Sequence, residues 1–247
     1  MTAEGAAVSI GAAIVSAIFS ATVAGLFFTR RKPHHAMWSV GLLMFTAVTV
    51  IQSVAELGGW TDRLFKAWYV LGTSLVGFLG AGSVYIVHRR LGHAFAAFVL
   101  VVFALLIAVA VATPTNPQAI ASFGGPNVAV SGAGWAGSAP RAISPILNVP
   151  GALALIGIAL IGLIRYRLWY NAYIAIGATV LAIGTGLSRF GLPSLIYAAE
   201  FAGITIMFIG FRKAIELAKE RARQAPVMPP EPEAEGQARI VAKSAPK

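Results

Sequence analysis

Seven long runs of apolar residues dominate this chain, and polar segments separate them. A helix needs about 20 mainly apolar residues to cross the hydrocarbon core of a bilayer. A transmembrane β-barrel would instead show segments of about ten residues that alternate apolar and polar side chains, and these runs do not alternate. Only 11% of the residues are charged, whereas soluble domains have about 25%. The sequence therefore predicts an all-α, polytopic membrane helix bundle with seven transmembrane helices, at residues 6–28, 36–57, 67–87, 94–112, 149–164, 172–187 and 195–211.

The basic residues predict how these helices are oriented. Lys and Arg are enriched in cytoplasmic segments close to the ends of spans. They follow the first, third, fifth and seventh predicted helices, at residues 30–32, 89–90, 165–167 and 212–213, and six more lie in the C-terminal tail. This pattern predicts an N-terminus outside and a cytoplasmic C-terminus. We therefore expect a multi-pass protein of the cytoplasmic membrane.

The same distribution of bases bears on partners. The net charge is +10, but the bases form short clusters at helix ends, and no basic helix face or nucleic-acid motif is present. The sequence therefore predicts no nucleic-acid binding. Anionic headgroups of the cytoplasmic leaflet are a sufficient partner for these clusters.

Several kinds of chemistry are excluded or lack support. Cysteine is absent, so disulfides, thiolate metal sites and cysteine nucleophiles are excluded. No paired-aspartate, Ser/His or metalloprotease motif supports hydrolysis. The four histidines lie at the inner ends of predicted helices, where they could form a metal or haem site, but no carboxylate accompanies them and bases surround them. We interpret them as structural, facing headgroups, and expect no metal, no cofactor and no enzymatic activity. They are His34, His35, His88 and His93.

Two further segments complete the predicted organisation. A long external loop at about residues 113–147, rich in Pro, Gly and Ser, interrupts the seven-helix domain at residues 1–217. Its composition favours flexibility, although Phe123 and Trp135 could fold it down as an external lid. Residues 218–247 are rich in proline and mixed charge, which predicts a disordered cytoplasmic tail.

Charged residues within or beside the apolar runs are the main indication of function. Glu56 and Glu200 are the only acids inside these runs, and Arg189 ends the sixth run. Ionisable groups inside a membrane are costly and usually paired or functional. One interpretation is a structural clamp in which Arg189 pairs with either carboxylate. The other is an outward-facing site for a polar or charged ligand with aromatic walls, formed by Glu56, Arg189, Glu200, Trp60, Trp68 and Tyr69.

The chain also resembles a known kind of membrane protein. Residues 55–60 (AELGGW), 68–72 (WYVLG) and 80–85 (GAGSVY), with 200–203 (EFAG) and 208–211 (FIGF), are similar to a pattern in uncharacterised seven-helix membrane proteins of bacteria. The resemblance implies the architecture and transfers no activity. Retinal proteins share seven spans, but they need a lysine in the seventh helix, and the seventh predicted span contains none.

Three functions remain open from the sequence, and the one without a supporting motif is an intramembrane enzyme or haem protein. The leading hypothesis is binding or transport of a small solute through a polar site in the outer half of the bundle. The alternative is a sensor or scaffold subunit that works with another membrane or cytoplasmic protein, or as a homo-oligomer, through its basic inner rim and tail.

Overall fold

The computed structural model describes residues 3–123, 128, 130–187 and 194–224. Within these ranges the regular secondary structure is helical, and an isolated β-bridge joins Thr115 to Trp135. The predicted all-α class is therefore confirmed. The elements are α1 (Ala3–Arg30), α2 (Pro33–Gly58), α3 (Asp62–Val87), α4 (Arg89–Ala112), α5 (Pro117–Ser122), the 3₁₀ turn η1 (Gly132–Gly134), α6 (Ala139–Tyr166), α7 (Tyr170–Leu187) and α8 (Ser194–Gln224).

Six of these helices, α1, α2, α3, α4, α6 and α8, are long and apolar enough to cross a membrane. They indicate a multi-pass membrane protein. The predicted sixth span corresponds to α7, whose apolar part, Tyr170–Gly184, is shorter than the other six.

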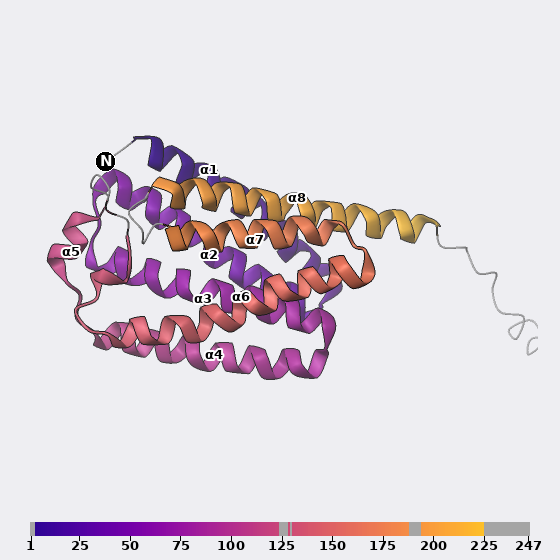
Figure 1. Ribbon diagram of the computed structural model, residues 1–247, viewed down its shortest axis with the longest axis horizontal. Coiled ribbons are helices and arrows are strands. Elements are labelled where there is room, and N and C mark those ends of the chain that lie inside the picture. Colours follow the sequence, from indigo (N-terminus) through magenta and orange to yellow (C-terminus); the bar gives the residue numbers. More distant parts are fainter. Residues whose placement is uncertain (1–2, 124–127, 129, 188–193, 225–247) are drawn as a thin grey trace, which may run out of the picture. The chain divides into compact units, whose positions relative to one another are not determined.

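The chain divides into two compact units, Met1–Arg212 and Lys213–Lys247. In the first unit α3 packs against α2, α4 and α6, while α1 packs on α2 and α7 on α6 (Figure 1). Of the second unit the structure describes residues 213–224, which end α8. The rest of the predicted tail lies outside the described residues.

Glycine pairs allow two of the helix crossings to be close. A Cβ atom on Gly80 of α3 would lie 2.6 Å from the carbonyl oxygen of Gly151 in α6. A Cβ atom on Gly177 of α7 would lie 2.6 Å from the carbonyl oxygen of Gly203 in α8. Small residues permit such approaches between membrane helices, where van der Waals packing is a main source of association.

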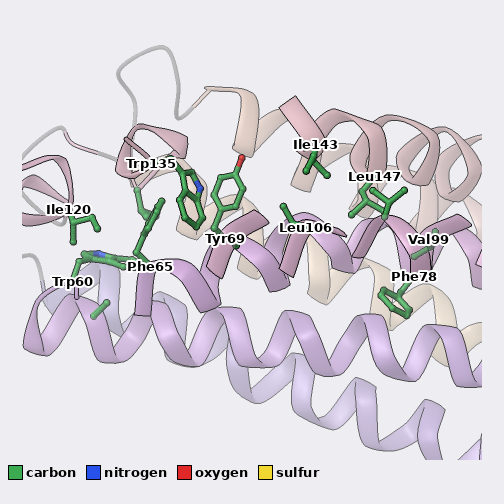
Figure 2. Packing of buried hydrophobic residues seen from close by; sticks show 14 of the residues in the cluster. Trp60, Phe65, Tyr69, Phe78, Val99, Leu106, Ile120, Trp135, Ile143 and Leu147 are labelled. Atoms are coloured by element: carbon green, nitrogen blue, oxygen red, sulfur yellow. The ribbon is translucent and has the colours of Figure 1, made fainter. Parts of the chain in front are cut away.

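The described part of the segment between α4 and α6, residues 113–123, 128 and 130–138, is here called the cap. It is folded onto the end of the bundle where α2 meets α3. Trp135 and Phe123 are buried, and Phe65 of α3 packs against both rings. Figure 2 shows Phe65 beside Trp135. The backbone N–H of Asn116 donates to the carbonyl of Gly134 over 2.8 Å. In the described part of the cap, burial of aromatic rings thus outweighs the flexibility that its glycines favour, because a buried aromatic side chain removes a large apolar area from water.

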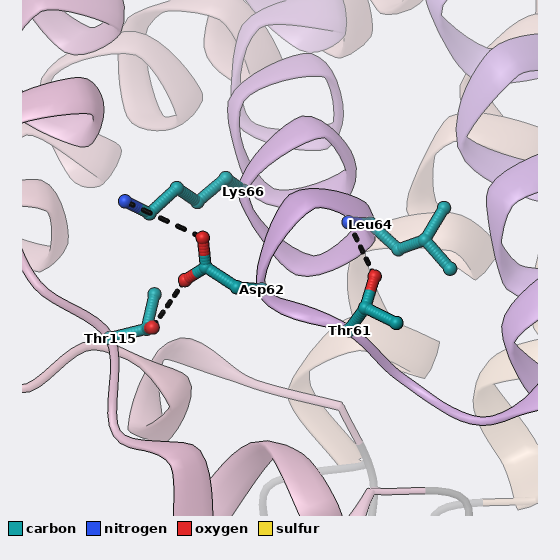
Figure 3. A network of polar contacts seen from close by, with 5 residues as sticks. All are labelled: Thr61, Asp62, Leu64, Lys66 and Thr115. Carbon is teal, nitrogen blue, oxygen red and sulfur yellow. Dashed lines mark hydrogen bonds and ion pairs between the residues drawn. The ribbon is translucent and has the colours of Figure 1, made fainter.

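Polar contacts fix the other side of the cap. Asp62, at the start of α3, accepts a hydrogen bond from the hydroxyl of Thr115 and forms an ion pair with Lys66 at 3.8 Å (Figure 3). Thr61 caps the same helix, since its hydroxyl oxygen accepts from the backbone N–H of Leu64 over 3.3 Å. The first turn of α3 is therefore a docking point for the cap.

Helix α6 begins at Ala139, within the range that the sequence assigned to the external loop. The difference arises from Pro145 and Pro150, which lie inside the helix but read as loop or interface residues in the sequence. Membrane helices tolerate proline because neighbouring groups satisfy the freed backbone carbonyls. The early start brings residues 139–148 of α6 alongside α3, where Tyr69 donates a hydrogen bond to the carbonyl of Pro140 over 3.4 Å.

Candidate functional site

Two polar pairs join α2 to α8. The hydroxyl of Tyr197 donates to Glu56 Oε1 over 2.5 Å, and Gln52 Nε2 donates to Glu200 Oε1 over 3.2 Å. Gln52 and Glu56 are four residues apart on α2, and Tyr197 and Glu200 are three apart on α8, so each pair of positions lies on one helix face. Residue numbers rise along one helix as they fall along the other, so the two helices run antiparallel here.

These groups are withdrawn from solvent and only partly satisfied. Gln52 is fully buried and Glu56 is 5% exposed. Gln52 Oε1 and Glu200 Oε2 are buried, and within the described ranges neither atom has a hydrogen-bond partner. A buried polar atom left without a partner costs about 1–3 kcal/mol, and more when it is charged. The α2–α8 pairs therefore contain two acceptors whose partners are missing from the described chain.

Glu200 also lies on the wall of a cavity of about 960 Å³ between α2, α3, α6, α7 and α8. Ligand pockets commonly have volumes of about 300–1,000 Å³, apolar walls and a few polar groups. Most of the lining is aliphatic, including side chains of α6 and α7. The polar, charged and aromatic lining residues are Phe45, Trp68, Tyr69, Thr73, Ser131, Arg141, Ser144, Asn148 and Glu200.

Arg141 is the residue of this cavity that the sequence analysis did not select. It lies in the first turns of α6, is exposed, and its aliphatic stem packs against Gly132 of the cap. Arg141 and Glu200 are the basic and acidic residues of the described lining. The only sequence signal was that Arg141 is a single base in a long uncharged segment. Its position depends on the early start of α6, which the sequence did not predict.

The residues selected from the sequence are distributed around this cavity. Trp68, Tyr69 and Glu200 line it. Trp60 is buried behind the wall, edge-on to Trp68 with ring centroids 5.8 Å apart. Glu56 is held by Tyr197 one helical turn from Gln52. Arg189 lies outside the described residues, so its pairing with Glu56 or Glu200 stays a prediction.

Gln52 and Tyr197, which hold the two carboxylates, were not found by the sequence analysis. Each lies within one helical turn of a selected acid, Gln52 before Glu56 and Tyr197 before Glu200. Spacing places such neighbours on one face but does not show which helix they meet. The spacing of Gln52 and Tyr197 was therefore visible in the sequence, but the helix that each of them faces was not.

The four histidines make local contacts. His88 caps α4 by accepting from the backbone N–H of Leu91, and the ring Nδ1 of His93 lies 2.9 Å from the hydroxyl of Tyr85. The rings of His34 and His35 lie 4.2 Å apart at the start of α2. In the part of the chain that is described, no group of three or more His, Asp and Glu residues is placed to hold a metal ion.

Comparisons of the chain with protein-family models, with curated proteins and with solved structures find no match. Function therefore has to be inferred from the site itself, from its geometry, its chemistry and its electrostatics. The cavity and the α2–α8 pairs are the features of the described chain on which such an inference can rest.

Proposed function

We propose that the chain is a seven-span protein of the cytoplasmic membrane, with the N-terminus outside and the C-terminus inside. Support for a span at α7 comes from its pairing with α8. Close contacts join Tyr173 to Gly210, Gly177 to Gly203 and Gly184 to Ala199, so α7 runs antiparallel along the apolar part of α8. An 18-residue helix is about 27 Å long, close to the roughly 30 Å hydrocarbon thickness. The basic ends of α1 and α6 support the orientation.

The function that the geometry supports best is binding of a small solute in the cavity, as a step in its transport or uptake. The observation that carries this proposal is that Arg141 and Glu200 line the same cavity, together with Trp68 and Tyr69. An apolar lining with a few polar groups is the usual construction of a small-molecule site. A space left only by imperfect packing would be expected to have an apolar lining, because buried charges without a partner are costly.

The lining also restricts the kind of solute. Arg141 presents a guanidinium group, which binds carboxylate or phosphate by paired hydrogen bonds. The aliphatic residues of α6 and α7 would contact an apolar body. We therefore propose an amphipathic solute with one anionic group that contacts Arg141. It would enter from the side of the cap, where Arg141 is exposed.

Thermal stability of the purified full-length protein, measured against a panel of small carboxylates, phosphate esters and zwitterions, tests this proposal. We expect at least one solute to stabilise the wild type saturably. Arg141→Gln should stay folded and bind that solute at least tenfold more weakly, a loss of about 1.4 kcal/mol. The matched control is Arg63→Gln, because Arg63 is exposed near the same end but does not line the cavity.

Two results would contradict the proposal. One is a wild type that no member of the panel stabilises. The other is an equal loss of solute binding in the Arg141 and Arg63 variants, which would show that bases near the cap act through general electrostatics.

A further inference from the structure

Buried polar atoms without partners occur at a similar depth on α1, α2 and α8. Gln52 Oε1 and Glu200 Oε2 are buried and lack partners in the described ranges, and the same holds for the hydroxyl of Ser9 on α1. Ser9 and Gln52 are themselves fully buried. Three unsatisfied polar atoms in one region need an explanation, because native structures leave few such groups.

The contacts between the helices place Ser9 at the depth of Gln52. Thr46 of α2 donates to the hydroxyl of Ser16 in α1 over 3.0 Å. Toward the N-terminus of α1, Ser9 lies about 10 Å along the helix axis from Ser16. Toward the C-terminus of α2, which is the same direction in space, Gln52 lies about 9 Å from Thr46. On the α8 side, a Cβ atom on Gly11 would lie 3.2 Å from the ring of Phe201, the residue next to Glu200.

The two unpartnered oxygens belong to side chains that are already in contact. Gln52 Nε2 and Glu200 Oε1 are 3.2 Å apart, and within each group the second polar atom lies about 2.2 Å from the first. The terminal torsions of Gln and Glu are broad. Rotation about these torsions allows both oxygens to turn toward a shared ligand.

In the described chain the hydrogen-bond partner of the Glu200 carboxylate is the neutral amide of Gln52, and no ion pair joins it to a base. Its titratable and charged neighbours there are Glu56, which accepts a hydrogen bond from Tyr197 over 2.5 Å, and Arg141 on the lining of the cavity. Neither α1 nor the facing part of α2 presents a base at this depth. A carboxylate beside neutral oxygens matches a ligand with one positive charge.

We propose that Glu200 and the oxygen of Gln52, with Ser9 nearby, bind one small monovalent cation, either a proton or Na⁺. Both ions have the same role here, since each neutralises Glu200 and engages the unsatisfied oxygens. Membrane transporters bind such coupling ions beside the substrate site. Because Glu200 also lines the cavity, cation and solute would share a wall. This consequence rests on the proposed solute site, whereas binding of the cation does not.

The test measures the melting temperature of the purified full chain without solute. Na⁺ is raised at constant ionic strength, with N-methylglucamine chloride as the replacement salt, and pH is varied separately in the absence of Na⁺. A Na⁺ site gives saturable stabilisation of the wild type by Na⁺. A proton site gives a wild type that Na⁺ leaves unchanged and that becomes more stable as pH falls, since burial favours the neutral acid.

In either case Glu200→Gln removes the dependence on Na⁺ or pH. The matched control Glu56→Gln, on the face of α2 that carries Gln52, keeps this dependence. Should Glu200→Gln fail to fold, Gln52→Met decides, because it preserves volume but removes the amide oxygen. We expect it to shift the midpoint of the Na⁺ or proton titration at least tenfold.

The proposal is overturned if the wild type and Glu200→Gln respond identically to Na⁺ and pH, or if Gln52→Met leaves the midpoint unchanged. Failure of the solute proposal looks different. In that case cation binding persists, and no solute of the panel stabilises the protein.

Discussion

The two ends of the bundle use similar apolar side chains but differ in how closely the helices approach. At the end where α3 meets α4, Trp38 lies against Gly82, and its ring stacks on Phe211 at 6.0 Å. At the end where α2 meets α3, Trp68 and Tyr69 instead line a cavity of about 960 Å³. Phe65 also lies against Gly134 at this end, and Tyr69 lies beside Gly132, so contact with a glycine does not by itself close the space between the helices. The cavity beside Trp68 and Tyr69 supports the proposal that a solute enters from the cap side.

The largest expected effect is a loss of stability at the cap end of the bundle that leaves the other end unchanged. Trp135→Ala removes a ring that packs on Phe65 and Tyr69 in the cap, so we expect a loss of about 3–5 kcal/mol in unfolding free energy. Hydrogen exchange should rise in α5 and η1 while α4 near His93 stays protected. An equal rise in hydrogen exchange at both ends of the bundle would contradict the claim that the two ends differ in stability. Trp169→Ala is the control, because its ring is exposed.

A second prediction concerns the α2–α8 contact beside the cavity. Tyr197→Phe keeps the ring and removes the hydroxyl that donates to Glu56. A hydrogen bond to a charged group contributes about 1.5–3 kcal/mol, so the unfolding free energy should fall by that amount. Tyr166→Phe at the end of α6 is the control, because Tyr166 is exposed. If Tyr197→Phe unfolds at the wild-type temperature, the hydrogen bond to Glu56 contributes nothing measurable to the stability of the α2–α8 contact.

The helix crossing between α3 and α6 allows a third comparison. Gly80→Ala places a Cβ atom 2.6 Å from the carbonyl oxygen of Gly151, which we expect to cost about 1–3 kcal/mol through overpacking. Gly157→Ala on α6 is the control, because its Cβ atom would meet nothing within 4 Å. Thermal unfolding in detergent measures both. Equal stability of the two variants would show that the crossing relaxes without cost.

The smallest effect is expected at the exposed docking point of the cap. Lys66→Gln removes the ion pair with Asp62, whose side chain is 52% exposed, and a cation–π contact with the ring of Trp135 at 5.9 Å. Exposed pairs contribute about 0–1 kcal/mol, and salt screens them further. We expect a change in melting temperature close to the error of the measurement, and none at high salt. A loss as large as that of Trp135→Ala would mean that charge rather than aromatic packing holds the cap.

The apolar runs predicted the long helices well, because burial in lipid demands nearly continuous hydrophobicity. The run at residues 36–57 became α2 (Pro33–Gly58) and the run at 94–112 became α4 (Arg89–Ala112). The start of α6 was missed, since Pro145 and Pro150 break helices in water but stay inside this one. A sequence pattern reports hydrophobicity along the chain and not the partners that satisfy a freed carbonyl.

The candidate site was predictable only in part, for a related reason. Acids in apolar runs are conspicuous because burial penalises them, so Glu56 and Glu200 could be selected from the sequence alone. Their partners Gln52 and Tyr197 are ordinary residues, and Arg141 lay in a segment expected to be a loop. Which side chains meet across helices depends on packing, and the sequence does not encode the packing in any single run.

The central claim is that the cavity is open to the outside, and the absence of cysteine makes a direct measurement simple. Ser144 lines the cavity, Ser122 is exposed on the cap, and Thr29 is exposed near the basic end of α1. Each would be changed to cysteine singly and exposed to a membrane-impermeant thiol reagent on intact cells. We expect Ser144→Cys and Ser122→Cys to react and Thr29→Cys to react only after permeabilisation. Labelling of Thr29→Cys on intact cells, with Ser144→Cys protected until permeabilisation, would contradict the orientation and the outward-facing site together.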